Sequence, residues 1–323
     1  MIRYSSLILA TALGTAALPA LAEAPKVVTD IPVVGALVQQ VMGDLGQPKV
    51  LLQAGGDPHS YQLRPSQARS LQDANLLIWV GPELTPWLER AKAGLSAQGE
   101  MLTLLDLPGT HRRNYAEDGH GHDHEHEHEH EHEHEHEHEH HAGDEGHDHS
   151  GTDPHAWLDP ANGRAWLAAI ADTLSLRDPD NAPVYAANAT NAINEISALD
   201  DELEVNLSSA QGKRFVVFHD AYGYFTEHYG LEPAIAVSLG DASTPSAARL
   251  KAIRDEIVEQ NAVCAFPEAN HDPKLIVAAV EGSSVRQGAA LDPEGTGLPL
   301  GAGLYAEILR GTGQALADCL GAE

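Results

Sequence analysis

The stretch Arg214 to Tyr229 reads RFVVFHDAYGYFTEHY. Within it, Arg214 to Phe218 is a short apolar run typical of a buried strand, and Tyr222 to Tyr229 has the pattern of a helix. A strand that leads directly into a helix is the repeating unit of a parallel α/β sheet. We therefore predict an α/β fold in which His219 lies at the carboxyl end of a strand, where such sheets bind their ligands.

The same alternation of strand and helix extends over both halves of the chain. Apolar runs bounded by turn residues predict strands, and apolar residues three and four apart predict helices. The predicted strands are Val27–Ile31, Lys49–Gln53, Leu76–Val80, Met101–Leu105, Arg214–Phe218, Ala234–Leu239, Val263–Phe266 and Val285–Ala290. The predicted helices are Pro32–Gly43, Pro65–Ala74, Glu83–Ser96, Tyr222–Tyr229, Pro245–Gln260, Pro273–Glu281 and Leu304–Leu320. This pattern predicts two β/α lobes, each with a mainly parallel sheet flanked by helices.

One longer helix is predicted between the two lobes. Its apolar residues recur every three or four positions and therefore share one face: Ile193, Ile196, Leu199, Leu203 and Leu207. The predicted domains are a signal peptide at 1–22, an N-terminal lobe at 23–178, a linker helix at 179–211 and a C-terminal lobe at 212–323. Two lobes joined by one helix leave a cleft between them, which is the expected binding site.

The first 22 residues predict export. Met1-Ile2-Arg3 makes a positive start, Leu7 to Leu18 is apolar, and Ala20-Leu21-Ala22 has the small residues of a cleavage site. A membrane anchor is the alternative, but the run is shorter than the roughly 18 residues that span a bilayer. We expect cleavage after Ala22 and an exported protein that does not insert into the membrane.

The two cysteines, Cys264 and Cys319, can form a disulfide in an oxidising compartment. A disulfide closing a loop of 55 residues contributes roughly 3 to 5 kcal/mol to stability. Two buried thiols are the alternative. Because the chain has only two cysteines and 5% aromatic residues, we favour the disulfide.

The chain of 323 residues carries 48 acidic and 19 basic residues, a formal net charge of −29. Such a charge repels nucleic acid and anionic membrane surfaces, so neither is an expected partner. Residues 117–149 hold 14 of the acidic residues, none of the basic ones and 14 of the 20 histidines. The composition therefore favours a cation as the partner.

Histidine and glutamate alternate from His124 to His140 inside this insert. The H-E-x-x-H pattern of metalloproteases matches seven times, but the matches follow from low complexity, because no apolar face could hold a catalytic helix in a core. A segment so charged is expected to be disordered. It either collects zinc weakly at many sites or is a solvated spacer. The candidate auxiliary ligands are His120, His122, His124, His126, His128, His130, His132, His134, His136, His138, His140, His141, His147 and His149.

Three of the other six histidines lie where this fold places ligands. His219 ends a predicted strand, His59 follows another, and His155 lies in a turn-rich segment. Taken singly, each is typical of a hydrogen-bonded structural histidine, but their joint placement favours a metal site. Asp292, at the end of the last predicted strand, is a fourth candidate. Neutral imidazoles suit tetrahedral Zn²⁺, whereas Mn²⁺ favours more carboxylate ligands.

The segments around these residues resemble those of the metal-binding solute-binding proteins of bacterial ABC transporters, and most closely the zinc-uptake members. The resemblance covers essentially the whole mature chain, and four ordered motifs make it specific. The motifs are Gly56-Asp57-Pro58-His59 with Leu63-Arg64-Pro65-Ser66 downstream, Asp153-Pro154-His155-Ala156-Trp157-Leu158-Asp159-Pro160, Phe218-His219-Asp220-Ala221-Tyr222-Gly223-Tyr224-Phe225, and Leu291-Asp292-Pro293.

The resemblance implies that Zn²⁺, the transported ligand, binds between two lobes to His59, His155 and His219. Manganese-type relatives carry Glu at the position of His219, so this position favours zinc. Some zinc-type relatives carry Glu immediately before the first histidine, where this chain has Pro58. Asp292 or a water is then expected to complete the site.

The resemblance also bears on the second lobe. Cys264 and Cys319 match a disulfide seen in some relatives. Where similar proteins often have a Gln-containing loop, this chain has Glu268-Ala269-Asn270-His271. We expect Glu268 and His271 to lie near the cleft, either supporting the ligands or as incidental neighbours.

The expected function is capture of Zn²⁺ in the periplasm by a monomer that is not an enzyme. The expected partners are an integral-membrane permease and a cytoplasmic ATPase of a zinc ABC transporter. Three alternatives stay open. The first is a manganese or iron carrier of the same fold. The second is a secreted zinc hydrolase, which needs a general base and for which Glu268 is the candidate. The third is a periplasmic zinc buffer that never docks on a permease.

Overall fold

The computed structural model describes residues 24–92, 99–115, 151–238 and 245–322. The predicted signal peptide and the histidine-rich insert lie outside these ranges. The N-terminal sheet contains four parallel strands in the order β2-β1-β3-β4. They are β1 (Val27–Thr29), β2 (Lys49–Val50), β3 (Leu76–Trp79) and β4 (Glu100–Thr103).

Three helices belong to this sheet: α1 (Pro32–Met42), α2 (Pro65–Gln72) and α3 (Pro86–Ala91). Each begins with proline, whose fixed φ suits the first helical position and whose missing N–H has no helical partner there in any case. Alternate residues of β3 enter two different cores, with Leu76 and Ile78 packed on the side of α1 and Leu77 and Trp79 on the other side. The sheet is therefore covered on both faces, as parallel sheets are.

The C-terminal sheet has the equivalent strand order, β6-β5-β7-β8, and is also parallel. Its strands are β5 (Phe215–His219), β6 (Ile235–Ser238), β7 (Cys264–Phe266) and β8 (Arg286–Gln287). Its helices are α6 (Gly223–His228), α7 (Ala247–Glu259) and α8 (Lys274–Val280). The two-sheet α/β fold predicted from the sequence is confirmed.

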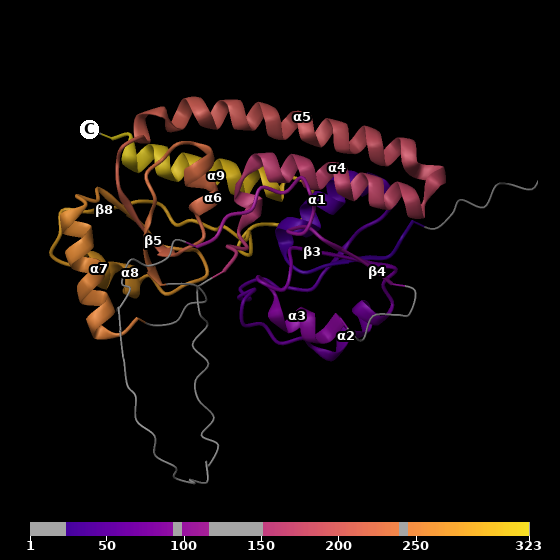
Figure 1. The fold of residues 1–323 in the computed structure, drawn as a ribbon, viewed down its shortest axis with the longest axis horizontal. Helices are drawn as coiled ribbons and strands as arrows, with labels where there is room; N and C mark the ends of the chain where they lie inside the picture. The colour runs from indigo at the N-terminus through magenta and orange to yellow at the C-terminus, as the bar shows by residue number, and fades with distance from the viewer. Residues whose placement is uncertain (1–23, 93–98, 116–150, 239–244, 323) are drawn as a thin grey trace, which may run out of the picture.

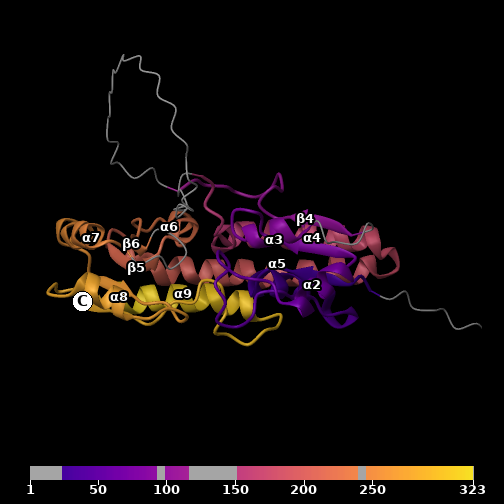
Figure 2. The ribbon, with the colours of Figure 1, turned by 90° about the horizontal axis from the view of Figure 1, so that it is seen from below.

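Three long helices connect the halves: α4 (Pro160–Arg177), α5 (Ala182–Leu207) and α9 (Leu304–Leu320). Figure 1 shows α5 along one side of the molecule, with α4 and α9 beneath it, and the view in Figure 2 places the two sheets at opposite ends of this layer. Short 3-10 turns, Pro179–Asn181 and Ser208–Ala210, flank α5. None of the described helices is both long and apolar enough to cross a bilayer.

One continuous core runs through the helical layer into both sheets. On α5 it includes Ile196, Leu199, Leu203 and Leu207, and it extends from β1 to the end of α9. At Gly163 on α4, a Cβ atom would lie 2.2 Å from the hydroxyl of Tyr305 on α9, so the Tyr305 side chain packs on the α4 backbone more closely than a larger residue would allow. Helix α9 also contacts α1 and α5. The halves are thus joined by packed helices and not by α5 alone.

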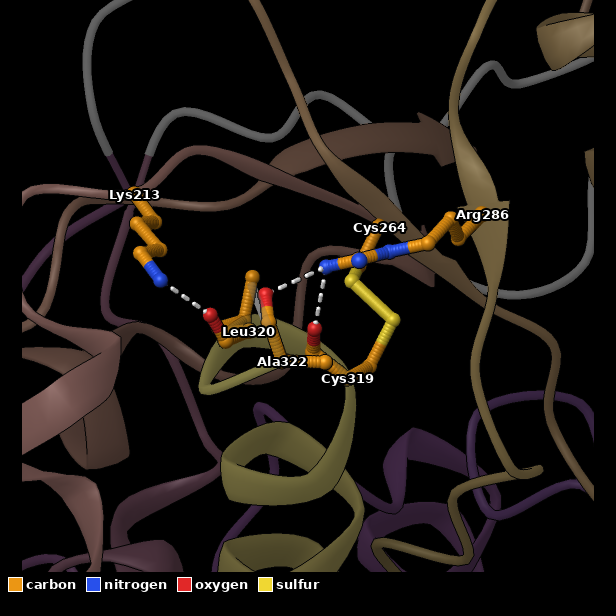
Figure 3. Close-up of a disulfide and its surroundings, with 6 residues drawn as sticks. All are labelled: Lys213, Cys264, Arg286, Cys319, Leu320 and Ala322. Carbon is orange, nitrogen blue, oxygen red and sulfur yellow. Dashed lines mark hydrogen bonds between the residues drawn. A yellow bond between two sulfur atoms is a disulfide. The ribbon is translucent and has the colours of Figure 1, made fainter.

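Cys264 and Cys319 form a disulfide between the start of β7 and the end of α9 (Figure 3). The last turn of α9 has further partners, because Lys213 Nζ donates to Leu320 O at 2.5 Å and Arg286 Nη2 donates to Cys319 O at 2.7 Å. Cations at a helix C-terminus satisfy free carbonyls and complement the helix dipole. The predicted disulfide is confirmed, and it ties the connecting layer to the C-terminal sheet.

Helix α4 is the main element that the sequence prediction lacks. Its buried residues include Trp166, Ile170 and Leu174, which lie one helical turn apart and would have indicated a helix. Helix α3 begins at Pro86, three residues later than predicted. The predicted extension of α3 to Ser96 and the end of the strand at Leu239 fall outside the described residues.

Candidate metal centre

Three histidines converge from separate parts of the chain. His59, His155 and His219 each offer a ring nitrogen, and these atoms lie within 4.8 Å of one another. His59 comes from the loop after β2, His155 directly precedes the 3-10 turn Ala156–Leu158, and His219 is the last residue of β5. Within the described residues, no other group of His, Cys, Asp and Glu meets this distance condition.

His155 and His219 face one another through the nitrogens that a metal needs. Their Nε2 atoms are 3.4 Å apart and both residues are buried. Two atoms about 2.0 to 2.1 Å from one tetrahedral Zn²⁺ lie about 3.3 to 3.4 Å apart. The spacing of these two nitrogens therefore already matches one edge of a zinc tetrahedron.

A buried carboxylate orients the ring of His155. The Nδ1 atom lies 2.8 Å from Asp153 Oδ1, and the other oxygen of Asp153 accepts a bond from Arg113 Nη1 at 2.7 Å. The Asp153 carboxylate, already bridged to Arg113, is the acceptor of this hydrogen bond, so Nδ1 of His155 donates and Nε2 is the ring nitrogen that faces the cluster. Such carboxylate partners fix the tautomer and raise the basicity of metal-binding histidines.

Glu268 holds His219 in the same way. Both carboxylate oxygens lie 2.8 Å from His219 Nδ1, and the hydroxyl of Tyr222 donates to Oε1 at 3.1 Å. Burial by itself lowers the pKa of His219, but the negative charge and hydrogen bond of Glu268 outweigh it and raise the pKa to about 9. Sequence reasoning placed Glu268 near the cleft, and the structure gives it a contact with His219.

His59 is supplied by a loop that is itself tied down. Asp57 accepts hydrogen bonds from the His59 backbone N–H at 2.8 Å and from the Ser60 hydroxyl at 2.7 Å. Trp87 Nε1, on α3, donates to Pro58 O at 2.6 Å. The His59 ring centroid lies 5.4 Å from that of His155. Residues 23–178, the predicted N-terminal lobe, thus supply His59 and His155, and the C-terminal sheet supplies His219.

Asp292 lies outside the group of three histidines. Its Oδ1 accepts the backbone N–H of Thr296 at 3.1 Å, and its Oδ2 accepts that of Gly297 at 2.9 Å. The carboxylate of Glu294 also lies outside that group, but its Oε1 is 3.8 Å from His219 Nε2. Burial raises the pKa of Glu294 to about 8, against the opposing positive charge of His219. Sequence reasoning missed Glu294, although it stands only two residues after Asp292.

His271 lies beside the cluster without joining it. Its ring stacks on Phe218 with centroids 4.2 Å apart, and it lies 6.3 Å from the ring of His219. Its Nε2 is 3.7 Å from Glu268 Oε2. Burial lowers the pKa of His271, so this ring is neutral at neutral pH and adds no positive charge next to the metal-binding nitrogens.

The cluster can bind a cation, and its geometry disfavours a hydrolytic role. Glu268, the candidate general base, has both oxygens against His219 Nδ1 and accepts the Tyr222 hydroxyl. It lies on the far side of the imidazole from Nε2, where a metal-bound water would stand. A base acts within hydrogen-bond reach of the proton that it removes, and Glu268 instead positions a ligand.

The histidine-rich insert is attached close to this cluster. Its candidate ligands, between His120 and His149, lie outside the described residues, but the base of the insert is described. Asn114 pairs with Thr152 in an antiparallel bridge, and Tyr115 N donates to Gly151 O at 3.0 Å. The two ends of the insert therefore pair with each other, and the chain resumes a few residues before His155.

Comparisons with known proteins agree with this geometry. The family model "Zinc-uptake complex component A periplasmic" matches residues 27–319. The high-affinity zinc uptake system protein ZnuA of Paracoccus denitrificans is 80% identical over the full length of both chains. The protein of the same name from Brucella abortus is 37% identical over 92% of both chains.

Solved structures share the fold. A crystal structure of ZnuA superposes with a TM-score of 0.72 at 25% identity, covering 92% of this chain and 99% of that chain. A manganese-bound periplasmic metal-binding protein of Candidatus Liberibacter asiaticus has a TM-score of 0.74 at 20% identity with the same coverage, which shows the fold alone. The resemblance noted in the sequence is thereby confirmed, and the chain belongs to the family of periplasmic zinc-uptake component A proteins.

Proposed function

We propose that this protein captures Zn²⁺ in the periplasm with His59, His155 and His219 and delivers it to the permease of an ABC transporter. The observation that carries the proposal is the convergence of three imidazoles, two of them with Nε2 atoms 3.4 Å apart. Membership of a zinc-uptake family supports the same conclusion. The cytoplasmic ATPase of such a transporter supplies the energy for transport.

The donor atoms favour zinc over manganese. Three imidazole nitrogens suit the tetrahedral preference of Zn²⁺, whereas Mn²⁺ is bound better by oxygen-rich sites. Carboxylates on Nδ1 of His155 and His219 make both rings better electron donors. A competition titration with Mn²⁺ and Fe²⁺ tests this preference. Retention of Mn²⁺ against equimolar zinc would indicate that the protein carries a metal other than zinc.

We propose that the lobes are residues 23–178 and 212–323, with 179–211 as the connecting helix. The cluster draws on both lobes, so binding stabilises their approach. Because α9 and α4 pack beside α5, we expect zinc binding to shift loops at the cleft more than it rotates whole lobes. Small-angle X-ray scattering with and without zinc measures this, and a large change in radius of gyration would contradict it.

Affinity measurements test the site directly. The mature chain without residues 117–149 is titrated with zinc against a chelator. We expect one tight equivalent, which is lost when His59, His155 or His219 is replaced by alanine in turn. His111→Ala is the matched control, because His111 is a histidine with a half-exposed side chain whose ring contacts Asp159 and Glu227. Tight binding that survives all three substitutions would contradict the proposed site.

Uptake measurements separate a transporter component from a buffer. The chain is expressed in a bacterium that lacks its own zinc-uptake binding protein, and growth is followed at limiting zinc. We expect the unaltered chain and His111→Ala to restore growth and the three site variants to fail. A chain that binds zinc tightly but never restores uptake would indicate a buffer.

We propose that the insert is a weak zinc collector near the cleft. Fourteen histidines between 117 and 149 chelate zinc, and the acidic residues among them raise the local cation concentration. Deleting 117–149 should lower the total zinc stoichiometry while leaving the tight site intact. An unchanged stoichiometry would show that the insert is a spacer.

A further inference from the structure

The three histidines leave one position of a zinc tetrahedron open, and the turn beside His219 carries two carboxylates. Asp292 and Glu294 stand two residues apart, in the turn that follows β8. The inference that follows rests on the proposed zinc site and concerns which of the two carboxylates faces the ion.

The carboxylate of Asp292 is already used by its own turn. Oδ1 accepts the N–H of Thr296 and Oδ2 that of Gly297, at 3.1 and 2.9 Å. Between Asp292 and Thr296, Gly295 adopts a φ of 68°, in the left-handed region that favours glycine. These contacts make Asp292 the residue that folds the turn, and turning its carboxylate toward an ion would break both bonds.

The carboxylate of Glu294 instead approaches one of the three histidines, His219, although it lies outside the 4.8 Å group that they form. Glu294 is 5% exposed, and its Oε1 lies 3.8 Å from His219 Nε2, which is the nitrogen that also faces His155. That distance is too long for a hydrogen bond. It exceeds by only about half an ångström the separation of two ligands in a zinc tetrahedron.

A tertiary contact holds the turn against the cluster. Trp157 Nε1 donates to Pro293 O at 2.8 Å, and the ring of Trp157 lies 5.3 Å from that of His155. The residue that follows Pro293 is Glu294, so the same indole contacts one ligand and fixes the backbone beside a second carboxylate. The position of Glu294 is therefore set by packing and not by a mobile loop end.

We propose that Glu294 supplies the fourth zinc ligand, giving three nitrogens and one oxygen, and that Asp292 positions it by folding the turn. A carboxylate also compensates part of the ion's charge, because the ligand imidazoles are neutral when they bind. With four protein ligands the ion is shielded from water inside the cleft. The carboxylates on Nδ1 of His155 and His219 remain outside the first coordination sphere.

The test compares Glu294→Gln with Asp292→Asn in the full mature chain. Co²⁺, whose visible spectrum reports its ligands, is added at less than one equivalent so that the tightest site fills first. Glu294→Gln should change the spectrum and lower zinc affinity by about 10- to 100-fold or more. Asp292→Asn should keep the spectrum, with at most a smaller loss of affinity. An altered spectrum for Asp292→Asn alone would overturn the assignment to Glu294. An unchanged spectrum for both variants would overturn it too.

A crystal structure of the unaltered, zinc-loaded protein decides the question independently of any folding defect in a variant. Glu294 should place an oxygen about 2.0 to 2.2 Å from the ion, and Asp292 should keep its bonds to Thr296 and Gly297. Asp292 or a water in the fourth position would overturn the inference while leaving the three-histidine site in place. Absence of zinc from the histidines would instead overturn the proposed function.

Discussion

The two sheets follow one plan but end differently at equivalent positions. In each, the strand that comes first in the chain lies beside the strand that comes third, as β1 beside β3 and β5 beside β7. After β1, Asp30 accepts the N–H groups of Ile31 and Val80 at 2.8 and 2.9 Å. At the end of β5, His219 contacts Glu268, which follows β7.

The comparison shows that topology decides where side chains meet, whereas residue identity decides what they do there. Parallel strands bring side chains together at their carboxyl ends in both sheets. In the first sheet, the buried carboxylate at this position, Asp30, accepts backbone N–H groups. The histidine of this part of the site, His59, comes instead from the loop after β2. In the second sheet an imidazole and its carboxylate occupy the strand ends themselves. The carboxyl edge of the first sheet stabilises the fold, and that of the second sheet forms part of the metal centre.

The largest expected effect concerns the disulfide, which only the second sheet has. Both cysteines of the chain are in this bond, and they are 55 residues apart. Replacing both by alanine should lower the free energy of unfolding by about 4 kcal/mol, because the unfolded chain regains loop entropy. Urea denaturation of the oxidised and substituted proteins measures the loss. A change below about 1 kcal/mol would show that packed helices, and not the disulfide, hold this half together.

The pH dependence of zinc affinity comes next. The pKa of His219 is raised to about 9 in the absence of metal, so at pH 7 zinc must displace a proton from this ring. Affinity should therefore fall up to about tenfold per pH unit below pH 9 and level off above it. Isothermal titration in buffers of different ionisation enthalpy counts the released protons. A flat affinity between pH 8 and about pH 5.5 is incompatible with imidazole ligation.

Glu268→Gln and Asp30→Asn compare the two strand ends directly. Glu268→Gln should weaken zinc binding about 10- to 100-fold, because His219 loses the carboxylate that orients it. Asp30→Asn should leave zinc affinity unchanged, since Asp30 contacts only backbone N–H groups among the bonds described. Burial raises the pKa of Asp30 to about 7, so ionising this carboxyl costs stability as pH rises from about 4 to 7, and Asp30→Asn should remove that dependence. Equal losses of affinity in both variants would show that the two edges are not functionally distinct.

The smallest effect involves a second histidine with a raised pKa. Hydrogen bonds from His228 to Asp159 and Asp200 raise its pKa to about 9. Its stabilisation is fully present below the unfolded pKa of about 6.5 and is lost as pH rises through 9. His228→Gln should cost on the order of 1 kcal/mol or less at pH 6, since the pair is partly exposed, and almost nothing at pH 10.

Thermal unfolding at both pH values measures this cost, and zinc affinity should not change. A pH-independent loss of stability would indicate that His228 contributes by packing alone. The two histidines with raised pKa values differ in their neighbours: His219 lies beside two other imidazoles, whereas His228 contacts Asp159, Asp200 and the ring of Tyr229.

Most of the fold could be predicted from the sequence, because the patterns that indicate strands and helices are local. Each of the eight predicted runs overlaps a strand, and β1, β3, β5 and β7 are fully buried, as apolar runs predict. The stripe on α5 is largely buried too, whereas both residues of β8 are exposed. Helix α4 was missed although Trp166, Ile170 and Leu174 show helical spacing. That the connecting layer includes α4 and α9 could not be inferred, because it depends on contacts such as Gly163 with Tyr305.

The site likewise has a part that the sequence predicts and a part that depends on long-range contacts. Strand-end position and motif resemblance indicated His59, His155 and His219, and the structure brings them together. The arrangement of Asp292 and Glu294 could not be predicted from sequence. It depends on a turn closed by backbone hydrogen bonds and on Trp157, which lies 136 residues away from its partner Pro293. No local pattern in the sequence encodes such a contact.

X-ray absorption at the zinc edge tests the central claim most directly, on the chain without residues 117–149 loaded with one equivalent of zinc. Three imidazoles from the two halves of the molecule should surround a single four-coordinate ion. His219→Ala should reduce the imidazole count and abolish tight binding, whereas Asp30→Asn should leave the spectrum unchanged. A spectrum with fewer than three imidazoles in the unaltered chain, or one unchanged by His219→Ala, would contradict the account.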